Sequence, residues 1–370
     1  MLYIKVKIVD FFFLFFYLLF FSLNNNHKMG SKVSIMAAKK RKRIASSFHS
    51  VTSKAHSSSQ NSSYPNTPPN CTIDEKSHTV HDHSSHISSV TESMITSGRT
   101  FHHVENSAYW FPNDDEEMDR LIGQHFALKT LFDGNIHETI LKGLDLEHNN
   151  ALVLDLGCGP GTWIMDVATE YPSSEFIGVD MCDVFPNNIR PANVSFQVGN
   201  ILKRLPFSDN TFDFVNMRLF IIALKKEEWP ILLKEAYRVM KPGGYMQMVE
   251  CGMLERGNEF VRQSGTIFRE MIETLGQDPY VAFKMETLME QQDVEVCHYE
   301  NIDVFLGKQD RLSKEFLWDV CNIFKSAQAI IQEPLGYHTD NFHQFLEKLY
   351  KELQKKPDAI WSFSICVGRK

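Results

Sequence analysis

The stretch that most constrains the fold is 151–180, ALVLDLGCGPGTWIMDVATEYPSSEFIGVD. The short apolar run at 152–156 is typical of a buried parallel strand. Alternating glycines follow, then a helical stretch at 162–171 and a second apolar run at 175–179. This order predicts a strand–helix–strand unit with a glycine-rich turn, which is the place where α/β sheets bind ligands.

The spacing of the turn glycines indicates which ligand binds. They are Gly157, Gly159 and Gly161. Dinucleotide-binding turns follow G-x-G-x-x-G, but here Thr162 occupies the position of the third glycine. Asp155 lies within the strand, where a carboxylate repels a pyrophosphate but accepts hydrogen bonds from an ammonium group. Asp180 closes the second strand 19 residues after Gly161, close to the roughly 20 expected for a carboxylate that binds ribose. A ligand with an amino-acid end and an adenosine end therefore fits better than NAD, and we expect S-adenosylmethionine.

The rest of the chain continues the alternation of strands and helices. Further strands are expected at 194–198, 212–216, 245–249, 294–305 and 360–367. Helices are expected at 227–240 and at about 258–275, 280–291, 313–332 and 338–356. Pro230 is tolerated in the first turn of its helix. The pattern predicts an α/β, Rossmann-like fold: a doubly wound, mostly parallel seven-stranded sheet with a helical cap.

The composition divides the chain into three parts. Residues 1–108 are predicted to be a disordered tail, because the Ser- and His-rich sequence buries too little apolar surface to offset the entropy of ordering. Residues 109–256 are the predicted ligand-binding core, and 257–370 are the predicted cap with the last strands. An acidic run and helical periodicity predict a helix that ends before Gly134. That helix either covers one edge of the sheet or forms a lid over the ligand.

The N-terminal tail contains three short signals. The apolar run at 11–21 is too short to span a bilayer, so we interpret 1–28 as a mistaken leader, with translation starting at Met29, rather than as a membrane anchor. MGSKVS after that start matches the myristoylation pattern. The basic run KKRKR at 39–43 is either a nuclear import signal or a solvated charge cluster. We expect the protein in the cytoplasm, the nucleus or both.

Charge and cysteine content argue against several classes of protein. The net charge of −8 provides no basic field for sequence-independent binding of nucleic acid. The seven cysteines form no CxxC pair and have no ligand spacing with histidine. The histidines at 78–86 are close enough to suggest a metal site but are better explained as incidental. We therefore expect no metal and a reducing compartment.

Five motifs resemble those of a known family. VLDLGCGPG, GVD, LPFSDNTFDFV and RVMKPGG resemble, in order and spacing, the motifs of class I S-adenosylmethionine-dependent methyltransferases. YWFPNDDEEMDRLIGQHFALK resembles the fungal methyltransferase family that includes secondary-metabolism regulators. The resemblance covers about 109–252 and the closing WSFSICVGRK. It implies methyl transfer from S-adenosylmethionine to a small-molecule or protein acceptor.

The resemblance also implies roles for individual residues. The cofactor-binding set is Asp155, Leu156, Gly157, Cys158, Gly159, Gly161, Asp180, Met181, Asn200 and Ile201. Asp155 would orient the amino group, Asp180 would accept the ribose hydroxyls and Met181 would pack on the adenine. Asn200 replaces the acid that usually accepts the adenine amino group, so its hydrogen bond lacks charge assistance. Taken singly, each residue also has an ordinary structural explanation as a turn former or cap.

The acceptor is harder to predict. Arg218 and Glu250 end the fourth and fifth strands, where a substrate should approach. Arg218 could bind an acidic or carbonyl acceptor or pair with a cap carboxylate, and His125 is expected to be a packed histidine rather than a base. The absence of an NPPY sequence or a Pro-Cys loop makes nucleic-acid bases poor acceptors. A cofactor-binding regulatory protein with little turnover remains the alternative.

Overall fold

The structure, a computed structural model, describes residues 93–96, 98–102, 107–186 and 189–370. All of these described residues belong to one compact unit. The interpretations of the leader at 1–28, the basic run at 39–43 and the histidines at 78–86 concern residues outside the described part. The same holds for most of the predicted tail.

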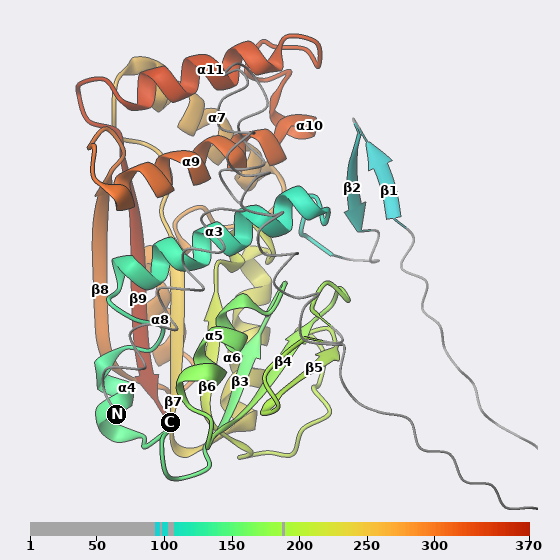
Figure 1. The fold of residues 1–370 in the computed structure, drawn as a ribbon, viewed down its shortest axis with the longest axis vertical. Coiled ribbons are helices and arrows are strands. Elements are labelled where there is room, and N and C mark those ends of the chain that lie inside the picture. The colour runs from blue at the N-terminus through green and yellow to red at the C-terminus, as the bar shows by residue number, and fades with distance from the viewer. Residues whose placement is uncertain (1–92, 97, 103–106, 187–188) are drawn as a thin grey trace, which may run out of the picture. The chain divides into compact units, whose positions relative to one another are not determined.

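A seven-stranded sheet forms the centre of the fold (Figure 1). Its strands are β3 (Leu152–Leu156), β4 (Glu175–Asp180), β5 (Val194–Val198), β6 (Phe212–Arg218), β7 (Met240–Cys251), β8 (Glu295–Phe305) and β9 (Ile360–Arg369). The order is β5-β4-β3-β6-β7-β9-β8, parallel from β5 to β7, with β9 antiparallel to both of its neighbours. The predicted seven-stranded, mostly parallel sheet is confirmed. Because the chain runs outward from β3 to β5 and then returns to β6, the topological switch lies between β3 and β6.

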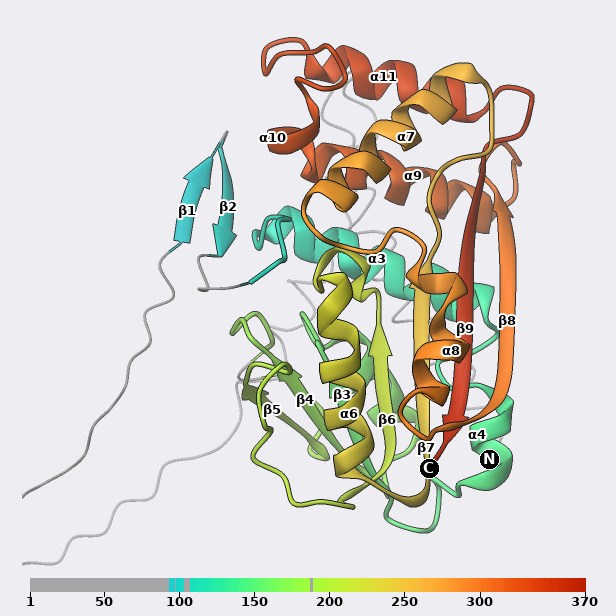
Figure 2. The ribbon, with the colours of Figure 1, turned by 180° about the vertical axis from the view of Figure 1, so that it is seen from behind.

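Helices cover both faces of the sheet. α4 (Glu138–Gly143) and α5 (Thr162–Glu170) lie on the face turned toward the viewer in Figure 1, whereas α6 (Trp229–Val239) and α8 (Met285–Glu290) lie on the face seen in Figure 2. α5 and α6 bury apolar stripes against the strands, as expected for amphipathic helices. Pro230 stands in the first turn of α6, as predicted.

The cap consists of helices beyond the end of the sheet where β3 and β6 finish (Figures 1 and 2). They are α3 (Asp115–Leu131), α7 (Glu259–Thr274), α9 (Arg311–Ser326), α10 (Gln328–Ile331) and α11 (Phe342–Leu353). Asp114 caps α3 by accepting a hydrogen bond from the backbone N–H of Glu117. The helix predicted at 280–291 is divided into a 3₁₀ turn at 281–283 and α8, and the helix predicted at 313–332 is divided into α9 and α10.

A β-hairpin lies in the stretch that was predicted to be disordered tail. β1 (Ser93–Thr96) and β2 (Arg99–His102) pair antiparallel, and Gly98 supplies the positive φ that the turn between them needs. The Arg99 guanidinium contacts the Asp114 carboxylate at 2.5 Å and so attaches the hairpin to the start of α3. The prediction for 93–102 is therefore corrected, because the tail composition did not show a long-range ion pair.

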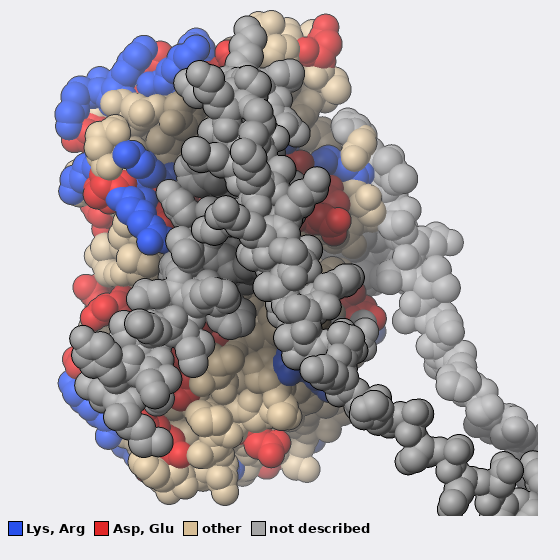
Figure 3. Space-filling view, viewed as in Figure 1, with Lys and Arg blue, Asp and Glu red and all other residues tan. Residues whose placement is uncertain are grey.

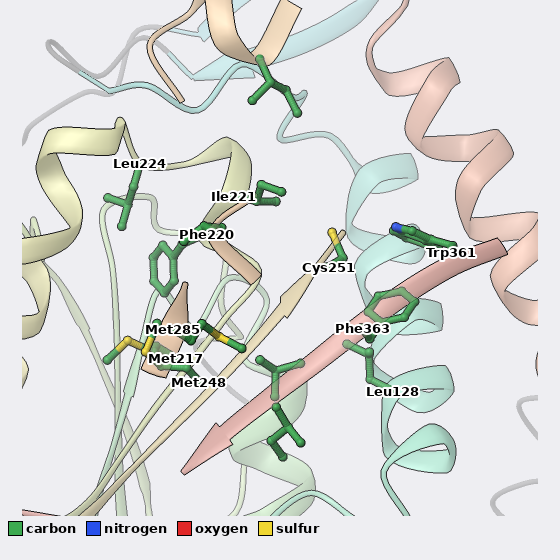
Figure 4. Close-up of a cluster of buried hydrophobic side chains, with 14 of the residues drawn as sticks. Leu128, Met217, Phe220, Ile221, Leu224, Met248, Cys251, Met285, Trp361 and Phe363 are labelled. Carbon is green, nitrogen blue, oxygen red and sulfur yellow. The ribbon is translucent and has the colours of Figure 1, made fainter. Parts of the chain in front are cut away.

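The sheet and the cap share one buried hydrophobic cluster (Figure 4). Met217 of β6 and Met248 of β7 lie in it with Phe363 of β9, Leu128 of α3 and Trp361 at the cap end. Sheet and cap therefore stabilise each other, and the boundary predicted at 256/257 falls inside a common core.

The surface of the cap is charged. On the face in Figure 3, Lys and Arg side chains gather at the upper left with Asp and Glu among them. Lys348, Lys351 and Lys355 are exposed on or just after α11.

No helix in the described part of the chain is long and apolar enough to cross a membrane.

Candidate functional site

A cavity of about 270 Å³ opens at the topological switch. One part, which we call the turn end, is formed by Asp155, Gly157, Gly159, Asp180 and Asn200. The other part, which we call the cap end, is formed by buried apolar side chains, and its members are Leu254, Phe268, Ile272, Phe324 and Trp361. The two ends belong to one continuous cavity between the sheet and the cap.

Most of the predicted site residues line this cavity. They are Asp155, Gly157, Cys158, Gly159, Asp180, Met181, Asn200, Ile201 and Arg218. Leu156 and Gly161 do not line it, although they adjoin residues that do. Leu156 is buried in the hydrophobic core, and Gly161 is the N-cap residue of α5.

The glycine turn has a left-handed backbone at each glycine, with φ of +61° at Gly157, +52° at Gly159 and +74° at Gly161. A Cβ on Gly157 would overlap the Phe220 ring, and one on Gly161 would overlap the Phe196 ring. A Cβ on Gly159 would meet nothing within 4 Å. The open space beside Gly159 therefore belongs to the cavity, where a ligand can approach the backbone.

Asp180 joins the end of β4 to the glycine turn. Its Oδ2 accepts a hydrogen bond from the Gly159 N–H at 2.8 Å, and its Oδ1 accepts one from the Cys182 N–H at 2.9 Å. Burial raises the pKa of this carboxyl above its usual value. Each oxygen keeps a lone pair that can accept a ribose hydroxyl. Asn200 is similar, because its Oδ1 accepts the Leu202 N–H at 2.8 Å and keeps one lone pair.

Asp155 is buried at the end of β3. Its Oδ1 accepts a hydrogen bond from Asn216 Nδ2 at 2.8 Å. Burial raises the pKa of Asp155 to about 7, although the positive charge of Arg218 acts in the opposite direction. A ligand ammonium group would favour the ionised carboxylate.

Arg218 ends β6 directly beside the turn. Its guanidinium carbon lies 5.9 Å from the centroid of the Trp163 ring, and its Nη2 lies 3.4 Å from His125 Nδ1. Burial lowers the pKa of Arg218 to about 10. Within the described part of the chain it forms no ion pair, so the second of the two alternatives for Arg218, a pairing with a cap carboxylate, is not found there.

His125 is held by Asp166 of α5. His125 Nε2 lies 3.0 Å from Asp166 Oδ2, which also accepts hydrogen bonds from Lys129 and Asn135 at 2.7 Å. Burial raises the pKa of Asp166, but these hydrogen bonds outweigh it and hold the pKa well below its usual range. Burial lowers the pKa of His125 to about 4, so the imidazole is neutral at pH 7. His125 is a packed histidine, as expected, but it also lines the cavity.

Glu250 lies away from the cavity lining. Its carboxylate accepts hydrogen bonds from the backbone N–H groups of Phe220 at 2.7 Å and Ile221 at 3.2 Å. Burial raises the pKa of Glu250 to about 8. Leu219, just before this turn, has a left-handed φ of +59°, which is strained for a leucine. Glu250 thus stabilises a strained turn, and we no longer assign it to the acceptor.

Several cavity residues were not predicted from the sequence. Arg120 donates to Glu117 and to Asp319 at 2.8 Å each, and Gln124 donates to Asp319 at 2.8 Å, so these two side chains of α3 already bond to their neighbours. Asn113 Oδ1 is buried and accepts no hydrogen bond from any described residue. A ligand donor would satisfy it. The aromatic run before α3 was the available signal, since Tyr109 and Phe111 also line the cavity.

Comparisons with known proteins agree with this geometry. Residues 153–244 match the family described as "Methyltransferase domain". "Secondary metabolism regulator LAE1" of Cochliobolus heterostrophus is 26% identical over 178 residues, which cover 48% of this chain and 56% of that protein. "Secondary metabolism regulator laeA" of Aspergillus fumigatus is 31% identical over 156 residues, which cover 41% and 39%. "N-methyltransferase verN" of Clonostachys rogersoniana is 27% identical over 275 residues, which cover 70% and 92%.

Residues 153–244 match a methyltransferase domain, and the sheet order and the glycine turn resemble those of class I S-adenosylmethionine-dependent methyltransferases. Within that class the chain resembles the fungal methyltransferases that include the secondary-metabolism regulators. It spans about half or less of the length of those regulators. S-adenosylmethionine is the cofactor of this class, and the open space at Gly159 and the unsatisfied Asn113 oxygen fit such a ligand.

Proposed function

We propose that the protein methylates an acceptor held at the cap end of the cavity, with S-adenosylmethionine held at the turn end. The continuous cavity that joins the two ends carries this proposal. The cofactor supplies an electrophilic methyl group, which an acceptor nucleophile attacks in line as the carbon–sulfur bond breaks. The protein contributes proximity and orientation, which are large terms in two-substrate reactions.

We propose that the turn end binds the cofactor through the predicted residues. The backbone at Gly157 and Gly159 approaches the methionine portion, and Asp180 accepts the ribose hydroxyls through its free lone pairs. Met181 and Ile201 flank the adenine, because they lie on the cavity wall after β4 and β5. We assign no general base, since the Nδ1 atom of the neutral His125 faces Arg218.

The cap end favours an apolar small molecule over a protein side chain. Phe268, Phe324 and Trp361 give it aromatic walls, and each is less than a tenth exposed. The polar atoms of Arg120 that would otherwise face an acceptor are bonded to Glu117 and Asp319. Burial of apolar surface, at about 25 cal/mol per Å², would then dominate acceptor binding.

Labelled methyl transfer in a cell extract tests the proposal. Extract of the source organism is incubated with the protein and S-adenosylmethionine labelled in its methyl group, and the products are partitioned into organic solvent and acid-precipitable protein. We expect label in the organic phase, and none above background with Asp180→Ala. Label in the protein pellet would identify a protein acceptor and contradict the small-molecule assignment.

The alternative is a regulatory protein that binds the cofactor with little turnover. Two of the relatives are named as secondary metabolism regulators, which favours it. The same extract experiment separates the two functions. Tight binding of S-adenosylhomocysteine without any transfer of label would support the regulatory function.

A further inference from the structure

We propose that Arg218 binds the carboxylate of the cofactor's methionine portion, so that Asp155 and Arg218 together recognise its amino-acid end. This inference rests on the proposed function, because it assigns a role within the same cofactor site. It replaces the sequence-based assignment of Arg218 to the acceptor.

The sheet places the two charges side by side. Leu156 of β3 pairs with Met217 of β6. The next residue of β6 is Arg218, which therefore lies beside Gly157, the first residue of the glycine turn. Asp155 and Arg218 both line the cavity, as does Gly157. An α-amino acid carries an ammonium and a carboxylate on one carbon, so it can bridge a neighbouring acid and guanidinium.

The charges of Asp155 and Arg218 act on each other, but neither side chain forms an ion pair with a residue in the described part of the protein. Among the described residues, the hydrogen bond to the Asp155 side chain comes from the neutral Asn216 amide. A buried charge without a partner is costly, and a ligand of opposite charge recovers part of that cost. The planar guanidinium fork suits a carboxylate, which it can bind through two parallel hydrogen bonds.

The neighbours of Arg218 hold it without neutralising it. Since Asp166 is ionised, it accepts the Nε2–H of His125, and the Nδ1 lone pair of that ring then faces the Arg218 guanidinium at 3.4 Å. Trp163 packs against the guanidinium from α5. These contacts fix the orientation of Arg218 and leave its charge available for an anion.

Three adenosyl compounds test this inference by calorimetry. S-adenosylhomocysteine carries the amine and the carboxylate, S-adenosyl-3-thiopropylamine carries only the amine, and 5′-methylthioadenosine carries neither. We expect the full-length protein to prefer the first over the second. We expect Arg218→Met to lose about 10- to 100-fold affinity for S-adenosylhomocysteine, the amount that a charged hydrogen-bonded pair provides. Its affinity for the other two compounds should change less than about twofold.

Control variants keep the result interpretable. Arg262→Met removes an exposed arginine of α7 and should change none of the three affinities. Arg218→Lys keeps the charge but not the fork, so it should retain part of the preference even if Arg218→Met fails to fold. Equal loss for all three compounds would overturn the inference, because it indicates a structural role. Unchanged S-adenosylhomocysteine binding would also overturn it, and would favour the earlier assignment in which Arg218 binds an acidic acceptor.

The experiment separates this inference from the proposed function. If the wild-type protein binds S-adenosylhomocysteine and S-adenosyl-3-thiopropylamine equally, the carboxylate site is wrong while the cofactor site stands. If it binds none of the three compounds, the proposed function itself fails.

Discussion

The turn glycines differ in what surrounds them, and this difference gives a paired test. Gly157→Ala would push a methyl group into the Phe220 ring at a left-handed position, so we expect it to lower the free energy of unfolding by about 3 kcal/mol. In Gly159→Ala the new methyl group faces open space. We therefore expect the free energy of unfolding to fall by only about 1 kcal/mol, the cost of a left-handed backbone at alanine. Gly159→Ala should nevertheless weaken S-adenosylhomocysteine binding, because its methyl group enters the cavity. Urea unfolding and calorimetry measure both effects, and equal stability losses would contradict the assignment.

His125 gives the protein a predictable dependence on pH. Burial lowers its pKa from 6.5 to about 4 in the folded state, so the unfolded chain binds more protons between these values. The stability that the neutral ring provides is present above pH 6.5 and is lost as the pH falls toward 4, by about 3 kcal/mol at most. Asp166, Lys129 and Arg218 are the charged groups that influence this ring.

Urea unfolding at several pH values measures this dependence. His125→Gln can still donate a hydrogen bond to Asp166 but does not titrate, so its free energy of unfolding should fall less steeply from pH 6.5 to 4. Identical slopes for the wild type and the variant would show that His125 does not carry the effect.

At the residue scale, the sequence predicted site residues that lie close together in the chain. It did not predict contacts between residues from distant elements. Asp155, Gly157 and Asp180, which line one cavity, could be grouped from the sequence because a motif of fixed spacing contains or closely follows them. His125, Asp166 and Arg218 come from α3, α5 and β6, and only the folded sheet brings them together. Glu250 was misassigned because its hydrogen bonds depend on the strained turn at Leu219, which no spacing pattern shows.

At the scale of elements, a buried ionic cluster joins α3 to the cap helix α9. Arg120 binds Glu117 on its own helix and Asp319 on α9, and all three side chains are at most 5% exposed. Arg120→Leu would leave two acids buried without their cation. We expect a loss of about 3–5 kcal/mol in the free energy of unfolding.

Arg262→Leu is the matched control for that variant. Arg262 pairs with Glu259 on the surface of α7, so we expect a change within about 0.5 kcal/mol. Chemical denaturation of both variants measures the difference. A similar small change for Arg120→Leu would mean that the cluster is not what joins the two helices.

The elements that the sequence predicted well are those with a strong apolar period. The strands predicted at 152–156 and 194–198 agree with the structure at both ends. Turn residues on both sides of each apolar run set the boundaries of the strand. The hairpin at 93–102 and the short α4 were missed, since their sequences have no such period and the hairpin is held through Arg99 and Asp114. The start of β7 at Met240 was also missed, because its pairing with Phe212 is separated from the rest of the ladder by an irregularity.

At the scale of the whole molecule, the cavity wall comes from α3, the sheet and the cap at once. Tyr109 and Phe111 precede α3, Asp180 ends β4, and Phe268 and Phe324 belong to α7 and α9. A ligand in this cavity contacts segments that share one buried hydrophobic cluster, so we expect these segments to unfold together. Cofactor binding is therefore coupled to the stability of sheet and cap rather than to one loop.

This coupling predicts a ligand-dependent unfolding temperature. S-adenosylhomocysteine at 100 times its dissociation constant should stabilise the protein by about 2.7 kcal/mol, because it binds only the folded state. NAD at the same concentration should leave the temperature unchanged, since Thr162 and Asp155 oppose a pyrophosphate. Differential scanning fluorimetry measures the shift, and hydrogen exchange should slow in both α3 and α9. A shift with NAD alone would contradict the cofactor assignment, and slower exchange confined to the glycine turn would contradict the coupling of cap and sheet.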